Sequence, residues 1–212
     1  MPEIANIKFS SLYRIFKRAK LFLSLVLKAI WLIHLPDERI IYNCINCGEC
    51  CKRLLIERQG VLKGLPLLPS EKILFHEGII KPGFGIGESG SRNFKIISYQ
   101  MTRGVCPNHI YNGCSVWTYR PAICRAYPIV PVISQGMKIV KTFDMTCTAL
   151  KDYASKYDGL PIPLEPMSVE SERQGYDEVV KITEAALEKI DKTWFYDLRT
   201  KKWVPFKNML SN

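Results

Sequence analysis

The residues in this sequence best suited to chemistry are its cysteines. Four of them lie within one eight-residue stretch, and four more follow downstream. The full set is Cys44, Cys47, Cys50, Cys51, Cys106, Cys114, Cys124 and Cys147. Four thiolates complete a tetrahedral zinc site or hold one iron–sulfur cluster. The total of eight therefore indicates two sets of four metal-binding thiolates.

The spacing of the first three cysteines favours iron–sulfur chemistry over zinc. Cys44, Cys47 and Cys50 have the C-x2-C-x2-C spacing that suits three corners of a [4Fe-4S] cluster, with a fourth thiolate arriving from a distant segment. Zinc ribbons and fingers more often present two separate C-x-x-C pairs, and only one region here contains such pairs. The later cysteines are separated by irregular intervals that fit neither pattern. We therefore predict a [4Fe-4S] cluster and retain zinc as the alternative.

The adjacent pair Cys50 and Cys51 suggests how the two sets divide. Consecutive side chains point in different directions, and to opposite faces if the backbone is extended. We therefore expect Cys51 to turn towards a second site or into the core. Which distant cysteine joins which site stays open. Arg120 and Arg125 flank Cys124, and we expect their guanidinium groups to stabilise a negatively charged thiolate site.

Disulfides are the competing use of cysteine, and three observations argue against them. The chain of 212 residues is longer than most disulfide-stapled domains, C-x-x-C spacing suits chelation, and neighbouring cysteines are poor disulfide partners. A reducing, cytoplasmic compartment is therefore expected. The formal charge is +10. Filling two four-thiolate sites would lower it by about 2 per site, which still leaves a basic protein able to approach an anionic membrane or a nucleic acid.

The elements that must position these cysteines divide the chain into three regions. Residues 1–36 contain a basic and apolar helix, 37–155 the cysteine-rich domain with a minor sheet, and 156–212 a helix and hairpin packed on it. In the last region, residues 169–190 have the apolar periodicity of a long helix, and residues 193–206 alternate as a hairpin. Residues 94–101 alternate as one strand, and 106–128 are rich in turn residues, which predicts irregular backbone. The fold class is therefore α+β.

The segment 9–35 is a candidate for binding a membrane surface instead of packing on the protein. Its apolar part is shorter than the ~20 residues of a transmembrane helix and is interrupted by Lys28. No small-residue cleavage site follows it, so a removed signal peptide is not expected. It is either a helix packed on the domain or a partner, or a basic helix lying in the membrane interface. In the latter case the protein would be peripheral to the membrane.

The glycine-rich segment and the histidines are two further candidates for a functional role. Gly85, Gly87 and Gly90 form a literal G-x-G-x-x-G, but the sequence after it alternates like a strand where a dinucleotide site needs a helix. A flexible loop is expected there. His109 is a further candidate ligand close to Cys106. The chain has only three histidines, which form no motif with a cysteine, so a nucleophilic-cysteine enzyme is not predicted.

The cysteine pattern resembles the CxxCxxCC, or YkgJ-like, family of cysteine-cluster proteins. The resemblance rests on 44–51, on the pair Cys106 and Cys114, on the decapeptide Tyr-Arg-Pro-Ala-Ile-Cys-Arg-Ala-Tyr-Pro at 119–128, and on the late Cys147. It covers about residues 40–150. The family is described as a zinc- or iron-chelating domain built on eight cysteines, so the resemblance implies that all eight are ligand candidates. A similar module occurs in flagellin lysine N-methylases, where it is associated with an iron–sulfur cluster.

Our first hypothesis is a metal-binding module that holds a [4Fe-4S] cluster and acts in electron transfer or as a redox-sensitive partner of another protein. A structural zinc-binding adaptor is the first alternative. An iron–sulfur-dependent transferase related to protein lysine methylation is the second, although the sequence displays no catalytic constellation for it. Membrane-surface binding through residues 9–35 and nucleic-acid binding, for which no motif is present, complete the alternatives.

Overall fold

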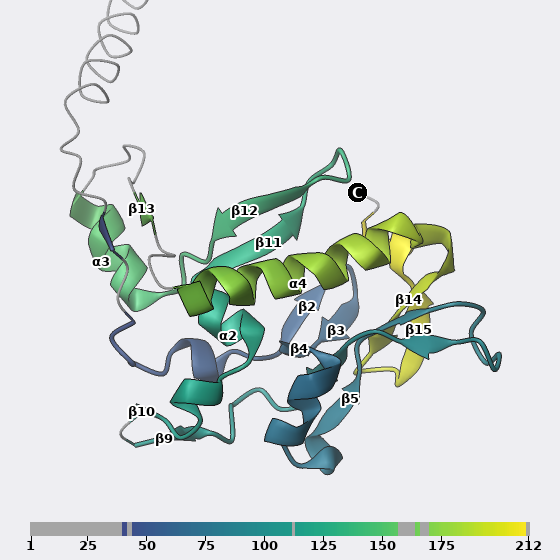
Figure 1. Cartoon of the computed structure of the whole chain (residues 1–212), viewed down its shortest axis with the longest axis horizontal. Coiled ribbons are helices and arrows are strands. Elements are labelled where there is room, and N and C mark those ends of the chain that lie inside the picture. The colour runs from purple at the N-terminus through teal and green to yellow at the C-terminus, as the bar shows by residue number, and fades with distance from the viewer. Residues whose placement is uncertain (1–39, 42–43, 112, 157–163, 166–169, 211–212) are drawn as a thin grey trace, which may run out of the picture.

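The computed structural model describes residues 40–41, 44–111, 113–156, 164–165 and 170–210. The helix expected within 9–35, and with it the question of membrane binding, lies outside the described residues. Within the described ranges, no helix combines the length and apolar character needed to cross a membrane. Helices and small sheets are mixed along the chain, as expected for an α+β protein (Figure 1).

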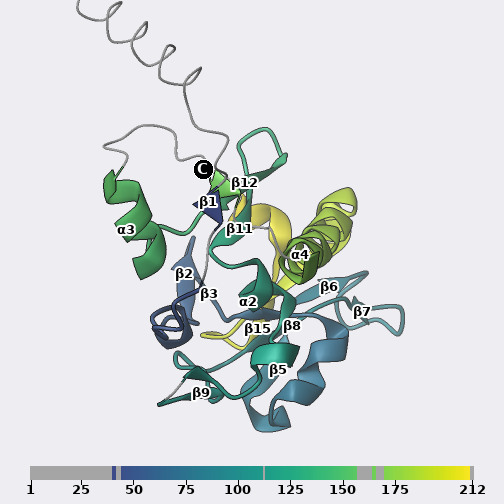
Figure 2. The same cartoon turned by 60° about the vertical axis from the view of Figure 1, so that its left-hand side comes forward.

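The longest element is the helix α4, Glu170–Glu188, which confirms the helix predicted from the apolar periodicity of 169–190. Tyr176 and Ala186 on this helix are buried. Two shorter helices accompany it, α2 at Ala122–Ala126 and α3 at Thr148–Lys156. The helix α4 packs closely on α2, and both views place α2 between α4 and the β9–β10 hairpin (Figures 1 and 2).

The largest sheet joins the C-terminal hairpin to an earlier hairpin. Its four strands follow the order β15-β14-β6-β7, from Lys202–Pro205, Thr193–Asp197, Phe84–Ile86 and Lys95–Ile96. The predicted hairpin at 193–206 is confirmed. Gly85, expected in a flexible loop, lies instead in β6, so the glycine-rich segment is part of a β-hairpin. The sequence analysis did not predict the pairing of β14 with β6, which links the C-terminal region to the cysteine-rich region.

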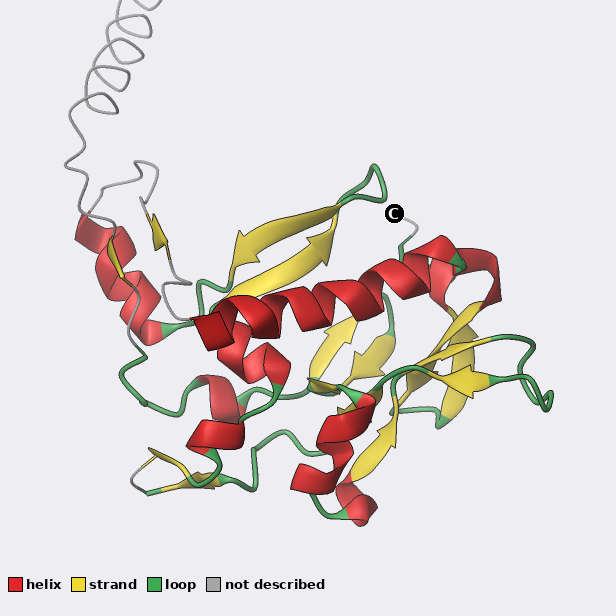
Figure 3. Ribbon diagram, viewed as in Figure 1, coloured by secondary structure: helices red, strands yellow, loops and turns green. Residues whose placement is uncertain are grey.

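The remaining strands form short sheets (Figure 3). The three-stranded sheet β4-β8-β5 comprises Pro66–Leu67, Tyr99–Met101 and Ile80–Pro82. The two-stranded pairs are β2–β3 (Ile56–Arg58, Val61–Lys63), β9–β10 (His109–Ile110, Gly113–Cys114), β11–β12 (Ile129–Ile133, Ile139–Phe143) and the parallel pair β1–β13 (Ile40–Ile41, Leu164–Glu165). Short 3-10 turns at Cys50–Lys52, Pro69–Leu74, Glu77–Ile79, Trp117–Tyr119, Ile190–Lys192 and Phe206–Met209 connect them.

The single strand expected at 94–101 is divided between two sheets. Its first part is β7 and its second part is β8, with Ser98 between them. The buried Ser98 explains the break, because its hydroxyl accepts a hydrogen bond from the Phe84 backbone N–H at 2.8 Å and its carbonyl accepts one from Gly83. The chain therefore turns from one sheet to the other around a satisfied polar residue.

The apolar core consists of several clusters rather than one layer. One cluster gathers Val61, Ala186, Phe195, Phe206 and Met209 beneath α4. A second gathers Leu54, Leu67, Phe75 and Met101 around the three-stranded sheet, with Cys106 at its edge. The buried Asp197 links β14 to β3 at the edge of the first cluster, since one of its carboxylate oxygens accepts the Leu62 backbone N–H at 2.9 Å.

Candidate metal centre

The structure brings all eight cysteines to one pocket. The pocket has a volume of about 80 Å³, and each of the eight residues lines it. Cys44 and Cys47 are exposed at its surface, Cys147 is buried, and the other five are half-buried. None of the eight forms a disulfide. Thiols as far apart in the sequence as Cys44 and Cys147 therefore share one small space.

The eight thiols share the pocket but do not converge on one point. Among the described residues, no three side chains of cysteine, histidine, aspartate or glutamate converge closely enough to hold one metal ion. A pocket of this size nevertheless exceeds the roughly 10–15 Å³ that a single water needs. The donor set fits zinc or an iron–sulfur cluster in chemical type, because both are bound by thiolates.

The motif 44–51 is folded as a loop that ends in a tight turn. The 3-10 turn at Cys50–Lys52 is closed by a hydrogen bond from the Cys51 backbone N–H to the Gly48 carbonyl at 3.0 Å. In the same loop, the Asn46 backbone N–H donates to the Cys44 Sγ at 3.4 Å. Backbone N–H donors of this kind stabilise a thiolate.

Cys50 and Cys51 lie in a 3-10 turn and line the same pocket, so they do not point to opposite faces as they would in an extended chain. That Cys51 belongs to a second site stays a prediction. The thiols of Cys50, Cys51 and Cys106 are close enough to shift one another's pKa values. The hydrogen bond from Cys51 lowers the pKa of Cys106 to about 6 and that of Cys50 to about 7, while the same two contacts raise the pKa of Cys51.

The second cysteine segment, 106–114, is held against the first by its backbone and by two glycines. The Cys106 N–H donates to the Cys51 carbonyl at 2.8 Å. Gly48 has a φ of +73°, and a Cβ there would overlap the imidazole ring of His109. Gly113 has a φ of +123°, and a Cβ there would overlap the Asn46 amide. His109 thus packs on the first motif and does not line the pocket, so its proposed role as a ligand gains no support.

Cys124 lies in a helix, where irregular backbone was predicted. The first turn of α2 is capped by a side chain from outside the helix, because the Glu71 Oε1 accepts the Ala122 N–H at 2.6 Å. The other oxygen of Glu71 accepts the Leu68 N–H at 2.8 Å. Burial raises the pKa of the Glu71 carboxyl and also that of the Cys124 thiol.

The helix α4 fixes α2 from the other side. The Arg125 guanidinium forms an ion pair with Glu178 at 2.6 Å. Gly175 allows the two helices to approach, since a Cβ there would lie 2.7 Å from the Ala122 carbonyl oxygen and 2.9 Å from the Arg125 Cβ. Arg125 therefore pairs with α4 through Glu178, and its expected stabilisation of the thiolates stays a prediction.

Cys147 reaches the pocket from the start of α3. Its backbone N–H donates to the Asp144 carbonyl at 3.1 Å, and the Asp144 backbone N–H in turn donates to the Pro128 carbonyl at 2.8 Å. Tyr127 also lines the pocket, and its hydroxyl lies 3.3 Å from the Thr146 hydroxyl. Burial raises the pKa of this phenol.

The basic residues near the motif divide into two groups. Arg120 lines the pocket, and its guanidinium stacks on the Trp117 ring with 3.8 Å to the ring centroid. Lys52 pairs with Glu49 at 2.8 Å on the surface, and Arg53 is exposed. Arg120 therefore lines the thiol pocket, whereas Lys52 lies at the surface, where Glu49 and, to a smaller extent, Cys47 raise its pKa.

Two contributors escaped the sequence analysis. The sequence analysis gave Glu71 no role, although its position three residues after Leu68 is the spacing of a capping box. Trp117 carried no signal of its own, and only its place three residues before Arg120 could have suggested the stacking. Both lie on 3-10 turns, which have no hydrophobic periodicity to reveal them.

Comparison with protein families gives one match. The model of the CxxCxxCC family, described as a "putative zinc- or iron-chelating domain", matches residues 43–149, which is about half of the chain and includes all eight cysteines. Searches of curated proteins and of solved structures found no match.

Proposed function

Because the chain belongs to the CxxCxxCC family of zinc- or iron-chelating domains, we propose that four of its eight thiols hold iron as a [4Fe-4S] cluster. One observation carries the proposal, namely that all eight cysteines line the same pocket. The C-x2-C-x2-C spacing of Cys44, Cys47 and Cys50 supplies three thiolates for one cluster. The fourth comes from a distant segment, and Cys106 is suited to it because its backbone is hydrogen-bonded to Cys51.

The surroundings of the pocket suit a charged, solvent-sensitive group. Leu65, Phe75 and Trp117 contribute apolar surface that limits the access of water. Arg120 supplies a positive charge, and the backbone amides of Asn108 and His109 contribute to the lowered pKa of the Cys106 thiol. Hydrogen bonds and charge of this kind raise the reduction potential of a cluster.

The functional consequence is electron transfer, or redox-dependent recognition of another protein. A bound cluster supplies reversible one-electron chemistry. The chain contributes a short path to the surface, because Cys44 and Cys47 are exposed. Exposed apolar residues surround this loop, including Ile45 at 57%, Ile110 at 51% and Trp117 at 44% exposure. A protein partner that covers them would bring its own redox group close to the thiolates.

The direct test is to measure iron and acid-labile sulfide in protein purified without oxygen. The expected result is equal iron and sulfide, near four of each per chain for one cluster, with a brown absorbance that dithionite bleaches. The variant Cys47→Ser should lose most of the iron and sulfide. Ile45→Ser, in the same loop, preserves all eight thiols and should retain both. Loss of iron in both variants alike would assign the effect to the loop rather than to the thiol.

Structural zinc is the second candidate, and the family description favours it equally with iron. Eight thiols suffice for two zinc sites of four thiolates each. One or two zinc ions per chain without sulfide would establish this alternative. The cysteines would then act in folding, since metal binding is coupled to folding in small zinc domains.

A further inference from the structure

A second and larger cavity lies on the opposite side of α2 from the cysteine pocket. Its volume is about 270 Å³, and it is bounded by α4, β11, the β2–β3 hairpin and the C-terminal turn at Phe206–Met209. Ala122 and Ile123 of α2 line this cavity, whereas Pro121 and Cys124 line the cysteine pocket. The helix α2 is therefore a shared wall between the two sites.

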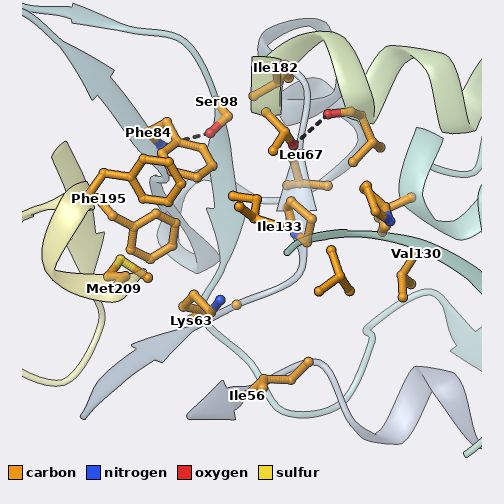
Figure 4. Close-up of a pocket in the computed structure, with 18 of the residues that line it drawn as sticks. Ile56, Lys63, Leu67, Phe84, Ser98, Val130, Ile133, Ile182, Phe195 and Met209 are labelled. Carbon is orange, nitrogen blue, oxygen red and sulfur yellow. Dashed lines mark hydrogen bonds between the residues drawn. The ribbon is translucent and has the colours of Figure 1, made fainter. Parts of the chain in front are cut away.

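The lining of this cavity is mostly apolar. Leu67, Phe84, Val130, Ile133, Ile182 and Phe195 contribute side chains from five separate elements (Figure 4). A cavity of 150 Å³ lined in this way holds benzene. Scaling by volume, 270 Å³ accommodates about eleven non-hydrogen atoms.

One side of the cavity is basic. Ile56 pairs with Lys63, and Arg58 pairs with Val61, across the β2–β3 hairpin. Directly opposed residues in an antiparallel pair lie on the same face, so Lys63 and Arg58 share the face on which Val61 enters the core. Both basic residues line the cavity, and Figure 4 shows the Lys63 amine directed towards it.

The Lys63 amine has no anionic partner among the described residues. Of the described residues that line the cavity, only Glu71 carries a carboxylate, and its two oxygens accept the Leu68 and Ala122 backbone N–H groups. Burial lowers the pKa of Lys63 to about 8, and the nearby charge of Arg58 adds to the effect. An apolar cavity thus contains a desolvated cation that an anion would neutralise.

We propose that this cavity binds a medium-chain carboxylate of about eight or nine carbons. The carboxylate group pairs with Lys63, with Arg58 nearby, and the hydrocarbon chain lies between β11, α4 and Phe84. The proposal concerns a site separate from the cysteines and does not depend on which metal they bind.

The test titrates the full-length protein with octanoate and, separately, with 1-octanol, using calorimetry. Octanoate should bind saturably with one molecule per chain. Lys63→Met keeps the length of the side chain and removes its charge, so it should weaken octanoate binding at least tenfold and leave octanol binding within twofold. Lys95→Met, an exposed lysine of β7 that does not line the cavity, should change neither ligand.

Two outcomes would overturn the proposal: octanoate that fails to saturate a site, and a Lys63→Met variant that loses both ligands equally or neither. If Lys63→Met does not fold, the exposed Arg58 provides the same test. Arg58→Met should weaken octanoate binding about threefold without affecting octanol, because a partly solvated charge contributes less than a buried one.

Discussion

Gly48 shows how one residue type can be required by two physical constraints at once. It lies in the left-handed region with a φ of +73°, and a Cβ would overlap the His109 ring. Gly60, in the β2–β3 turn, has nearly the same φ of +71° but has no atom within 4 Å of the position a Cβ would take. The two glycines therefore separate the cost of backbone conformation from the cost of the contact with His109.

Both Gly48→Ala and Gly60→Ala should lower the free energy of unfolding. The shared loss is about 1–2 kcal/mol, because a left-handed backbone is unfavourable for residues with a Cβ. Gly48→Ala should cost about 1 kcal/mol more, since His109 must move away from the motif. Chemical denaturation of the three proteins measures both losses. Equal losses would mean that the contact between His109 and Gly48 is energetically unimportant.

The buried Lys63 should make the stability of the protein depend on pH. Its pKa of about 8 in the folded protein is below the roughly 10.4 of an unfolded chain. The unfolded state therefore binds more protons between these values, and stability rises with pH across this window. The free-energy cost of holding the charged Lys63 amine in the folded protein is fully present below pH 8. It arises from burial and Arg58, and Glu71 does not relieve it because its oxygens are engaged by backbone N–H groups.

Lys63→Met should therefore stabilise the protein at pH 7 by about 1–2 kcal/mol, less than the full shift because the amine keeps some contact with water. The gain should disappear above about pH 10.4, where the lysine is neutral even in the unfolded chain. Urea denaturation of variant and parent at both pH values measures the difference. Lys95→Met is the matched control, and a gain that persists unchanged at high pH would contradict the electrostatic explanation.

At the scale of elements, the helix that carries Cys124 depends on its neighbours. The five residues of α2 are too few for a helix to be stable alone. Glu71 caps its first turn, and α4 covers its side through Gly175 and the Arg125–Glu178 ion pair. The position of one pocket-lining thiol is thus set by residues outside its own segment.

Gly175→Ala tests this arrangement because two effects have opposite signs. In an exposed helix interior, replacing glycine by alanine stabilises by about 1 kcal/mol. Here the new Cβ would lie 2.7 Å from the Ala122 carbonyl oxygen, so α4 must move away from α2. We expect a net loss of about 1–3 kcal/mol. Thermal unfolding measures it, with Gly136→Ala as a control whose added Cβ would meet no atom within 4 Å. A stabilised Gly175→Ala variant would show that α4 packs loosely there.

The elements predicted from the sequence are those with enough residues to show a period. The helix α4 spans about five turns, and β14 alternates along its five residues before a turn and the apolar residues of β15, so both were found. By contrast, α2 has five residues and β9 has two, which is too few for any pattern. The gathering of the cysteines could be expected from their number and the family resemblance. The contact between Cys50 and Cys51 could not, because it depends on a single 3-10 turn.

At the scale of the whole molecule, the region matched by the family ends before the C-terminal elements that pack against it. The match stops at residue 149, yet β14 pairs with β6, α4 packs on α2, and Asp197 accepts the Leu62 N–H. Phe195, Phe206 and Met209 also occupy the same core cluster as Val61. The C-terminal region therefore contributes a strand, a helix and core side chains to the cysteine-rich region.

A chain truncated after residue 155 should consequently fail to form the metal centre. It would expose one edge of β6, the α4-facing side of α2 and the cluster around Val61. The free energy lost with these contacts together exceeds the small free energy of unfolding of a typical small domain. We expect non-cooperative unfolding by circular dichroism and less than half the metal content per chain of the full-length protein. Adding the peptide 156–212 should restore part of both properties, because the missing strand and helix can pair in trans. A truncated chain that unfolds cooperatively and retains its full metal content would instead make residues 37–155 an autonomous domain, with the C-terminal helix and hairpin as an addition to it.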